Sequence, residues 1–448
     1  MKLLGQRGRA GTLLAFLGIW GCGGPPVPAE IPAAWSLEES SRPTRHEPIA
    51  ETLPDHLSIE QAVDEALRRN LTLLAQRLNL SIADAAIVAA RVRPNPLLSL
   101  DVDHASITHL SKGDLMEAAA RIDVPIVLGG KRDLRIEVAE KDRKIAEVQL
   151  EDSLRKLRQD VASACIDLVQ AKANLDLARD NLKTFEDLVR INEKRALAGA
   201  IAASEMTRSK VAMLQFRSGV KRAELELSGA KTRLKTLLGR GTAQGDLDLS
   251  DELAITPNDQ ILELPTLNQQ AFAMRPDLRA LELGQARSQS DIRLQIANGI
   301  VDLSAGAEYR WNAEEPSERL VGLFLSVPIP LWNQNAGEIA RAEAQRHQVT
   351  RQLDALKLDV AGDVRAAFDE FVSARDLVRS IEGELLQSAQ QVRDAESKRY
   401  QSGATSFLDF IDAQRAFNDA RQSLNDARAT YRRAVIRLNS AVGSEVIR

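Results

Sequence analysis

Two carboxylates near the carboxyl end of the chain have the spacing of a small acidic site. Asp409 and Asp412 lie three residues apart at the predicted start of a helix, so they share one face of its first turns. Acidic side chains at this position complement the positive end of the helix dipole, which is the simpler interpretation. The same pair, repeated around a three-fold axis, would instead form a ring that favours cations and repels anions. The residues alone leave both interpretations open.

No arrangement typical of catalysis accompanies this pair. The sequence has no Walker loop, no His-x-x-x-His pair and no nucleophile elbow, so we expect no enzyme activity, no catalytic residue and no cofactor. Of the five histidines, only His104 and His109 lie close together; the others are His46, His56 and His347. No cysteine or acidic cluster completes a metal site around that pair. We therefore predict solvated loop histidines and no metal site.

The amino terminus has the layout of a secretory signal. Basic residues precede an apolar run at 12–20 that is too short to span a bilayer, which predicts a signal peptide over 1–21. The sequence Ile19-Trp20-Gly21-Cys22 resembles a bacterial lipobox, in which the cysteine is acylated and becomes the new amino terminus. We therefore predict a lipoprotein anchored at Cys22. A plain signal peptide, or an incidental cysteine, is the alternative, since Trp20 stands where a small residue is usual.

The residues after this cysteine predict a location and a tether. Gly23 follows it, and no Asp is present there as an inner-membrane retention signal, which implies the outer membrane. Residues 22–56 are rich in Pro and Ser and should form an extended, lipid-anchored tether. No later run of about 18 apolar residues occurs, so we expect no transmembrane helix.

Residues 131–198 should form one very long helix. They contain no Gly and no Pro, and apolar side chains recur at alternating steps of four and three from Leu150 to Val189. Such a helix would be about 100 Å long and needs partners along its whole length. Cys165 lies beside this seam and should be a small buried residue. The net charge of −4, with both signs interleaved, gives no basic surface for nucleic acid.

The second half of the chain repeats the first. A shift of about 203 to 205 residues places Val124-Pro125-Ile126 on Val327-Pro328-Ile329 and Gly199 on Gly403. The chain therefore divides into repeat 1 at 57–240, a linker at 241–262 and repeat 2 at 263–448. Each repeat should contain a helix, a two-stranded hairpin, a long helix and a shorter helix. The predicted ranges are 58–91, 97–128, 131–198 and 204–238 in repeat 1, and 266–297, 300–331, 338–401 and 407–442 in repeat 2.

The two hairpins alternate apolar and polar residues with a period of two. Segments of about ten residues with this alternation are typical of outer-membrane barrel strands, although a soluble sheet with one wet face would match as well. On the membrane interpretation, the polar face lines a lumen; its charged residues are Asp101, Asp103, Asp302, Glu308 and Arg310. The polar strand tips, Ser106–Asp114 and Asn312–Glu318, would face outside. Four strands cannot close a barrel, and open edges are not tolerated in lipid, so three chains would share a barrel of twelve strands.

Several local motifs, in this order, resemble the TolC-like outer-membrane efflux factors. Arg275-Pro276-Asp277-Leu278 is similar to a motif of the family's second repeat. The turn from Val327 to Ile339 is similar to that of the heavy-metal branch, the CzcC-like and CusC-like proteins. Tyr400-Gln401-Ser402-Gly403, followed by Asp409-Phe410-Ile411-Asp412-Ala413, resembles the family's periplasmic helix-turn-helix tip. The resemblance covers nearly the whole mature chain.

This resemblance implies a fold and a set of partners. The fold would be mainly helical with membrane β-strands, as a homotrimer whose outer-membrane barrel continues into a periplasmic α-helical barrel. The trimer would contact outer-membrane lipid and dock an inner-membrane pump of the resistance-nodulation-division (RND) class through a periplasmic adaptor. It would serve as a passive exit duct, and the heavy-metal branch implies metal cations as the solute.

The resemblance also assigns a periplasmic gate. Asp409 and Asp412 match the family's aspartates at the narrow periplasmic end, and Glu205 matches Asp409 in the first repeat. The candidate gate residues are therefore Gly199, Glu205, Tyr400, Gly403, Asp409 and Asp412. The family often has an arginine where this chain has Thr405, so a gate-closing link through that arginine is not expected here.

Two other functions fit parts of the pattern. An exit duct for drugs, other organic solutes or proteins secreted by a type I system would share the same architecture, because a passive duct takes most of its specificity from the pump. A periplasmic coiled-coil adaptor or scaffold would share the heptads, but it would lack two copies of alternating membrane strands. Detergent dependence and trimer formation would separate a duct from a scaffold.

Overall fold

The structure is a computed structural model that describes residues 56–103, 117–240, 247–254, 257–258, 260–312 and 319–447. All of these lie in one unit of the chain, residues 52–448. The expected signal peptide, Cys22 and most of the tether lie outside the described residues, as do both strand tips except Asn312. His46, His104 and His109 lie outside them as well.

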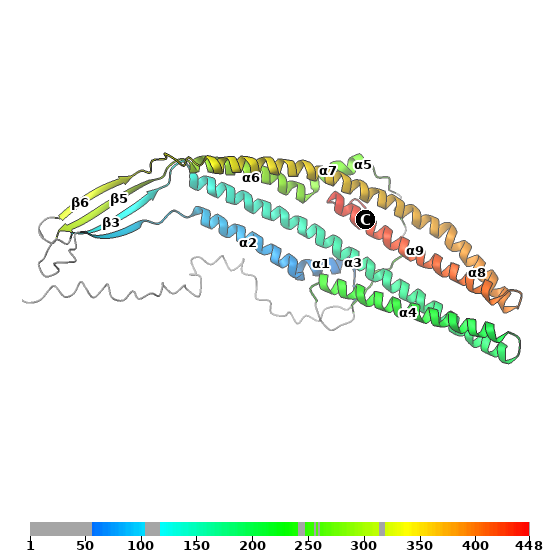
Figure 1. Cartoon of the computed structure of the whole chain (residues 1–448). Helices are drawn as coiled ribbons and strands as arrows, with labels where there is room; N and C mark the ends of the chain where they lie inside the picture. The colour runs from blue at the N-terminus through cyan, green and yellow to red at the C-terminus, as the bar shows by residue number, and fades with distance from the viewer. Residues whose placement is uncertain are drawn as a thin grey trace, which may run out of the picture. The chain divides into compact units, whose positions relative to one another are not determined.

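Among its described residues, repeat 1 contains four helices and two long strands, most of which are labelled in Figure 1. They are α1 (Ile59–Arg69), α2 (Leu71–Arg91), β2 (Leu97–Asp103), β3 (Glu117–Ile126), α3 (Lys131–Leu197) and α4 (Ala203–Leu237). Two short strands, β1 (His56–Leu57) and β4 (Asp248–Leu249), pair in parallel beside these helices. The 67 residues of α3 correspond to a helix of about 100 Å at the usual rise per residue.

Repeat 2 has the same order of elements. They are α5 (Leu264–Met274), α6 (Pro276–Asn298), β5 (Leu303–Asn312), β6 (Arg319–Ser326), α7 (Ala336–Ser380), a π-helical turn (Ile381–Leu385), α8 (Leu386–Gln401) and α9 (Phe407–Val442). The four long strands form one antiparallel sheet in the order β2-β3-β5-β6. In this sheet β2 and β6 are the edges.

Apolar seams hold each long helix against three shorter ones. Helix α3 contacts α1 and α2 over one part and α4 over another, while α7 contacts α5, α6 and α9. The cores are formed by side chains at the heptad positions, among them Val161, Leu168 and Phe185 on α3, and Val360, Phe371 and Val378 on α7. Apolar residues at alternating steps of four and three keep one stripe of each helix against its partner.

The first helix of each repeat is broken, where the sequence predicted one continuous helix. In repeat 1 the break is at Asn70, whose side-chain oxygen accepts from the Leu73 amide at 3.0 Å and whose amide nitrogen donates to the Leu237 carbonyl at 2.9 Å. In repeat 2 the break is at Arg275, because Pro276 lacks an N–H and disfavours helical backbone at the residue before it. Side-chain capping and proline geometry therefore break helices that the apolar periodicity alone would make continuous.

Helix α2 leaves much of its apolar surface uncovered. It buries Leu73 and Ile87 but exposes Leu78, Ile82 and Val88, although it lies along α3. Among the described residues it is the one helix with the length and composition to cross a membrane, whereas the sequence predicted none. One such helix is weak support for a membrane span, since core helices pass the same test.

Arg275 joins three helices through a buried cluster of polar contacts. Its guanidinium donates to both carboxylate oxygens of Asp277, at 3.1 and 2.6 Å, to Asp363 on α7 at 3.2 Å and to the Ala441 carbonyl on α9 at 3.4 Å. Burial raises the pKa of the Asp277 carboxyl, but the hydrogen bond and charge of Arg275 outweigh it, and the net shift is downward. The cluster therefore depends on an ionised Asp277.

Replacing Arg275 should destabilise the fold strongly. We expect Arg275→Ala to lower the free energy of unfolding by about 3 kcal/mol or more, because it leaves Asp277 without its buried partner. Arg279→Ala is the control: its pair with Glu151 is exposed, and the cost should stay below about 1 kcal/mol. Denaturant unfolding in detergent, followed by circular dichroism, compares the two. Equal losses would mean that the buried cluster contributes no special stability.

Candidate functional site

Two tight helix-helix turns bring the candidate residues of the two repeats together. Gly199 follows the end of α3 with φ of 71°, and Gly403 follows α8 with φ of 79°, a backbone region that favours glycine. In both turns the next amide donates back across the helix end, from Ala200 to the Arg195 carbonyl and from Ala404 to the Arg399 carbonyl, each at 2.8 Å. The two glycines therefore allow the backbone to turn sharply from one helix into the next.

Tyr400 connects the two turns. Its hydroxyl lies 2.9 Å from Oδ1 of Asn192 on α3 and 2.9 Å from Oε1 of Glu205 on α4. A hydroxyl has one proton, so it donates to one of these oxygens at a time. A half-turn of the Asn192 amide would remove the competition, because its nitrogen would then donate to the hydroxyl. Tyr400 thereby links repeat 2 to repeat 1.

The ring of Tyr400 is held by aromatic and cationic neighbours. It stacks on Phe410 with ring centres 5.3 Å apart and lies 6.0 Å from the ring of Phe407, while the Arg195 guanidinium lies 5.3 Å from its centre. The residue is only 4 % exposed. Burial, followed by the hydrogen bond to Glu205, raises the pKa of Tyr400 to about 12, so the hydroxyl stays protonated at neutral pH.

The two aspartates differ in their local contacts. Asp409 completes a capping box: its Oδ2 accepts from the Ser406 hydroxyl at 2.8 Å and from the Thr405 hydroxyl at 3.1 Å, while its own amide donates to Ser406 Oγ. These bonds, that from the Ser406 hydroxyl first, lower the pKa of the Asp409 carboxyl, which is therefore ionised at neutral pH. Asp412 is exposed, with Arg415 Nη1 at 4.0 Å.

The structure therefore gives Asp409 the capping role that the sequence offered as the simpler interpretation. Capping does not exclude a second role, because both aspartates are exposed on the first turns of α9. Glu205 occupies the matching third position of α4, but the residue before that helix is Ala202, which has no polar side chain to bond. Glu205 reaches across to Tyr400 instead. Thr405, which stands where the resemblance implies an arginine in many family members, donates to Asp409.

Sequence reasoning missed four members of the Tyr400 cluster: Asn192, Arg195, Phe407 and Phe410. One signal could have identified Asn192. It follows Phe185 and Val189 at the next seam position of α3, where an apolar residue is expected, and it is fully buried. A polar side chain on a buried seam needs a partner, and Tyr400 is that partner.

The expected lumen residues lie on or beside one face of the sheet, and most are ion-paired. Directly opposite residues share a face, and the polar rung runs Ser99, Arg121, Glu308, Gly322 across the four strands. Arg310 lies 3.0 Å from Glu308 and Arg121 lies 2.8 Å from Asp123. Asp302 precedes β5 and accepts from Lys131 Nζ at 2.8 Å and from the Leu128 amide at 2.9 Å.

Two further expected lumen residues lie on β2. Asp101 is exposed there. Asp103 is the last residue of the strand, and its side chain lies outside the described part of the structure.

The opposite face of the sheet is apolar and uncovered. The neighbouring rung runs Leu100, Ala120, Tyr309, Val321 across all four strands. Leu100 is 73 % exposed, Val321 is 76 % exposed and Leu323 is 87 % exposed. A contiguous apolar face that is exposed across four strands marks a contact with another protein or a membrane.

The described residues contain no cluster of three or more potential metal ligands. His56 lies 3.8 Å from Asp248, and His347 is part of α7. The Cys165 side chain is fully buried, and burial raises the pKa of its thiol to about 12, which makes it a packing residue rather than a nucleophile.

Comparisons with known proteins agree with this architecture. A family model described as "Outer membrane efflux protein" matches residues 62–240 and 267–444. The cobalt-zinc-cadmium resistance protein CzcC of Cupriavidus metallidurans is 24% identical over 364 residues, covering 80% of this chain and 83% of that protein. The pyoverdine export outer membrane protein OpmQ of Pseudomonas aeruginosa is 22% identical over 268 residues, covering 57% of this chain and 54% of that protein.

A solved structure shares the fold. The crystal structure of CusC superposes with a TM-score of 0.73 at 20% identity, covering 87% of this chain and 93% of that one. The family match includes both repeats, each with its own hairpin, long helix and shorter helix. The chain therefore belongs to the outer membrane efflux protein family.

Proposed function

We propose that three copies of this chain form the exit duct of a tripartite efflux system that releases heavy-metal cations. As a member of its family, the chain is an outer-membrane protein with helices that extend into the periplasm. In the proposed assembly the four strands of each copy contribute to a barrel of twelve. The helices of each copy contribute to a periplasmic α-helical barrel.

The observation that carries this proposal is the sheet. One face is apolar and exposed, the other carries paired charges, and both edge strands, β2 and β6, lack a partner on one side among the described residues. Unpaired backbone groups cost several kcal/mol each in lipid. Each strand of the sheet is antiparallel to its neighbour. Strand β6 of one copy can therefore pair with β2 of the next copy in the same antiparallel way. The uncovered face of α2 would then lie against the next copy.

The tip of the helices is the proposed gate, comprising Gly199, Glu205, Tyr400, Gly403, Asp409 and Asp412. Three copies would place six carboxylates from Asp409 and Asp412 around one axis, and such rings favour cations. The sheet face contributes less, because Asp123, Glu308 and Asp302 each have a basic partner. We therefore assign charge selectivity to the tip and a wide, tolerant passage to the barrel, whose lumen would include Asp101, Asp103 and Arg310.

The partners follow from the family resemblance. The duct would be anchored in the outer membrane by an acyl chain on Cys22. It would receive its solute from an inner-membrane pump of the RND class through a periplasmic adaptor. The name of CzcC, cobalt-zinc-cadmium resistance protein, supports metal cations as the solute. The name of OpmQ supports the second candidate, export of organic solutes.

Loss of the chain should sensitise its host to metals. A deletion strain should stop growing at lower concentrations of zinc, cobalt, cadmium, copper or silver than its parent. Plasmid expression of the chain should restore growth. Growth with organic antibiotics serves as the comparison, and sensitivity confined to antibiotics would favour the organic-solute function instead.

Removing the tip charges should reduce cation preference. Asp409→Asn with Asp412→Asn keeps the side-chain volumes but removes up to six charges per trimer, so the reversal potential in planar bilayers under a salt gradient should move toward zero. Asp354→Asn, an exposed acid on α7 paired with Arg351, is the control and should leave the reversal potential unchanged. An unchanged reversal potential in the double variant would reject the tip as the selectivity element.

Cysteines on the two edge strands should crosslink copies. Leu100→Cys on β2 and Leu323→Cys on β6 lie on the same exposed face, so a short thiol crosslinker should convert the double variant to covalent dimers and trimers. Each single variant should stay monomeric on denaturing gels. The pair Leu100→Cys with Tyr309→Cys is the matched control, because β5 lies inside the sheet. If only monomers form in detergent and in membranes, the shared barrel is wrong.

A further inference from the structure

The long helix of repeat 2 contains one residue more than its counterpart. Val378 follows the seam residue Leu175 by 203 residues, but Leu386 follows Leu182 by 204, and Gly403 follows Gly199 by 204. The extra residue therefore lies between 378 and 386. In repeat 1, α3 crosses the matching stretch as uninterrupted α-helix.

The structure accommodates this residue as a π turn. Residues Ile381–Leu385 are π-helical, and the Leu386 amide donates to the Ile381 carbonyl five residues back. A π turn is how a helix absorbs one inserted residue without changing the faces on either side, and it is a common site of helix bending. Gly383 lies in the middle of it, where a Cβ would meet no atom within 4 Å. Glycine adds backbone freedom at this point.

One ion pair fixes the π turn to the neighbouring helix. Arg428 on α9 donates to Oε1 of Glu382 from Nε at 2.8 Å and from Nη2 at 2.5 Å. The pair is about a quarter to a third exposed, so it is partly shielded from water. Charge-assisted hydrogen bonds of this kind are stronger than neutral ones. This pair therefore joins the π turn to α9.

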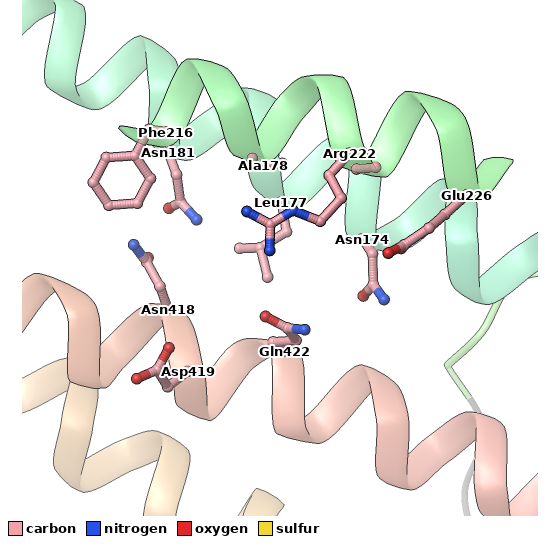
Figure 2. Close-up of a pocket in the computed structure, with 12 residues that line it drawn as sticks. Asn174, Leu177, Ala178, Asn181, Phe216, Arg222, Glu226, Asn418, Asp419 and Gln422 are labelled. Carbon is pink, nitrogen blue, oxygen red and sulfur yellow. The ribbon is translucent and has the colours of Figure 1, made fainter. Parts of the chain in front are cut away.

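At its tip the α8–α9 hairpin packs on repeat 1 through a buried apolar cluster that includes Phe185, Tyr400 and Phe410, but the packing is less complete between this cluster and the π turn. A cavity of about 270 Å³ lies between α9 and the pair α3–α4, and Figure 2 shows the residues that line it. Asn418 of α9 points toward it; its Oδ1 accepts from Gln414, but its amide nitrogen has no hydrogen-bond partner among the described residues, although the side chain is 7 % exposed. On α8, the buried Oε2 of Glu396 also lacks one there.

A cavity of this size beside α9 leaves room for the hairpin to shift relative to repeat 1. Asn181 on α3 lines the same cavity as Asn418 on α9. Nearby contacts between α9 and α3 include polar pairs, such as Asn425 with Asn174 at 3.0 Å and Gln170 with Asp426 at 2.7 Å. Polar contacts exchange partners with less loss than a packed apolar seam.

We propose that the π turn Ile381–Leu385 is a hinge at which α8, together with the start of α9, bends relative to α7, and that the Glu382–Arg428 pair is its latch. The hinge lies about 30 Å from the turn at Gly403, so a small bend displaces Tyr400 and Asp409 by several ångströms. The hinge itself does not depend on the solute. Its consequence for conduction rests on the proposed gate.

Hydrogen exchange on the intact protein in detergent tests the hinge directly. In the wild type, amides of residues 386–401 should exchange faster than the matching amides 182–197 of α3. Deletion of Gly383 should convert the π turn to α-helix and slow exchange of 386–401 by about tenfold. Gly383→Ala keeps the inserted residue and should slow exchange less than the deletion does.

The latch has its own test and a matched control. Arg428→Gln should speed exchange of residues 386–401 by about tenfold, because it removes a charge-assisted pair. Arg437→Gln removes the pair with Glu370, which joins the same α9 to α7 on the other side of the π turn, and should leave 386–401 unchanged. If Arg428→Gln and Arg437→Gln have equal effects, or if the deletion leaves exchange unchanged, the hinge is refuted. Hydrogen-exchange rates are measured independently of metal sensitivity, so the hinge and the proposed export function can be refuted separately.

Discussion

The fold depends on the apolar seam along each long helix. A helix of 67 residues has no stability of its own beyond what its partners provide, because helices in water are stabilised mainly by packing of an apolar face. In repeat 1 that face is covered by α1 and α2 over one part and by α4 over another, and repeat 2 does the same with α5, α6 and α9. The sheet and the two tight turns are thereby held at opposite ends of the same helices.

Periodicity predicted most of the architecture. The spacing of four and three located the long helices, the spacing of two located the strands, and the duplication located the repeats. The interruptions could not be read from periodicity, because they depend on single side chains. Asn70 breaks a helix by bonding the end of α4, and the inserted residue near Gly383 leaves the seam intact on both sides while changing the backbone between. A one-residue difference in the shift between repeats was the available signal.

The charges of the candidate site were predicted by type but not by pairing. Sequence alternation placed Glu308 and Arg310 on one face of a strand, but only the register shows how that face is completed by Arg121 and Asp123. Asp302 is neutralised by Lys131, which precedes it by 171 residues and follows a turn of the other repeat. At the tip, Tyr400 was predicted as a gate residue, while its bond to Asn192 depends on two helices lying side by side. Pairings of this kind are tertiary and cannot be derived from local pattern.

Because helices that lie side by side have matched lengths, the protein can become longer only by matched insertions. The number of residues in each helix sets its length. An insertion of seven residues adds about 10.5 Å and keeps the apolar seam on the same face of the helix. The chain passes along the tip half twice in each repeat, on α3 and α4 and again on α7–α8 and α9. Lengthening that half therefore requires four insertions of the same size at matching levels. Any one of them alone would displace one turn relative to the other and break the contact between Tyr400 and Glu205.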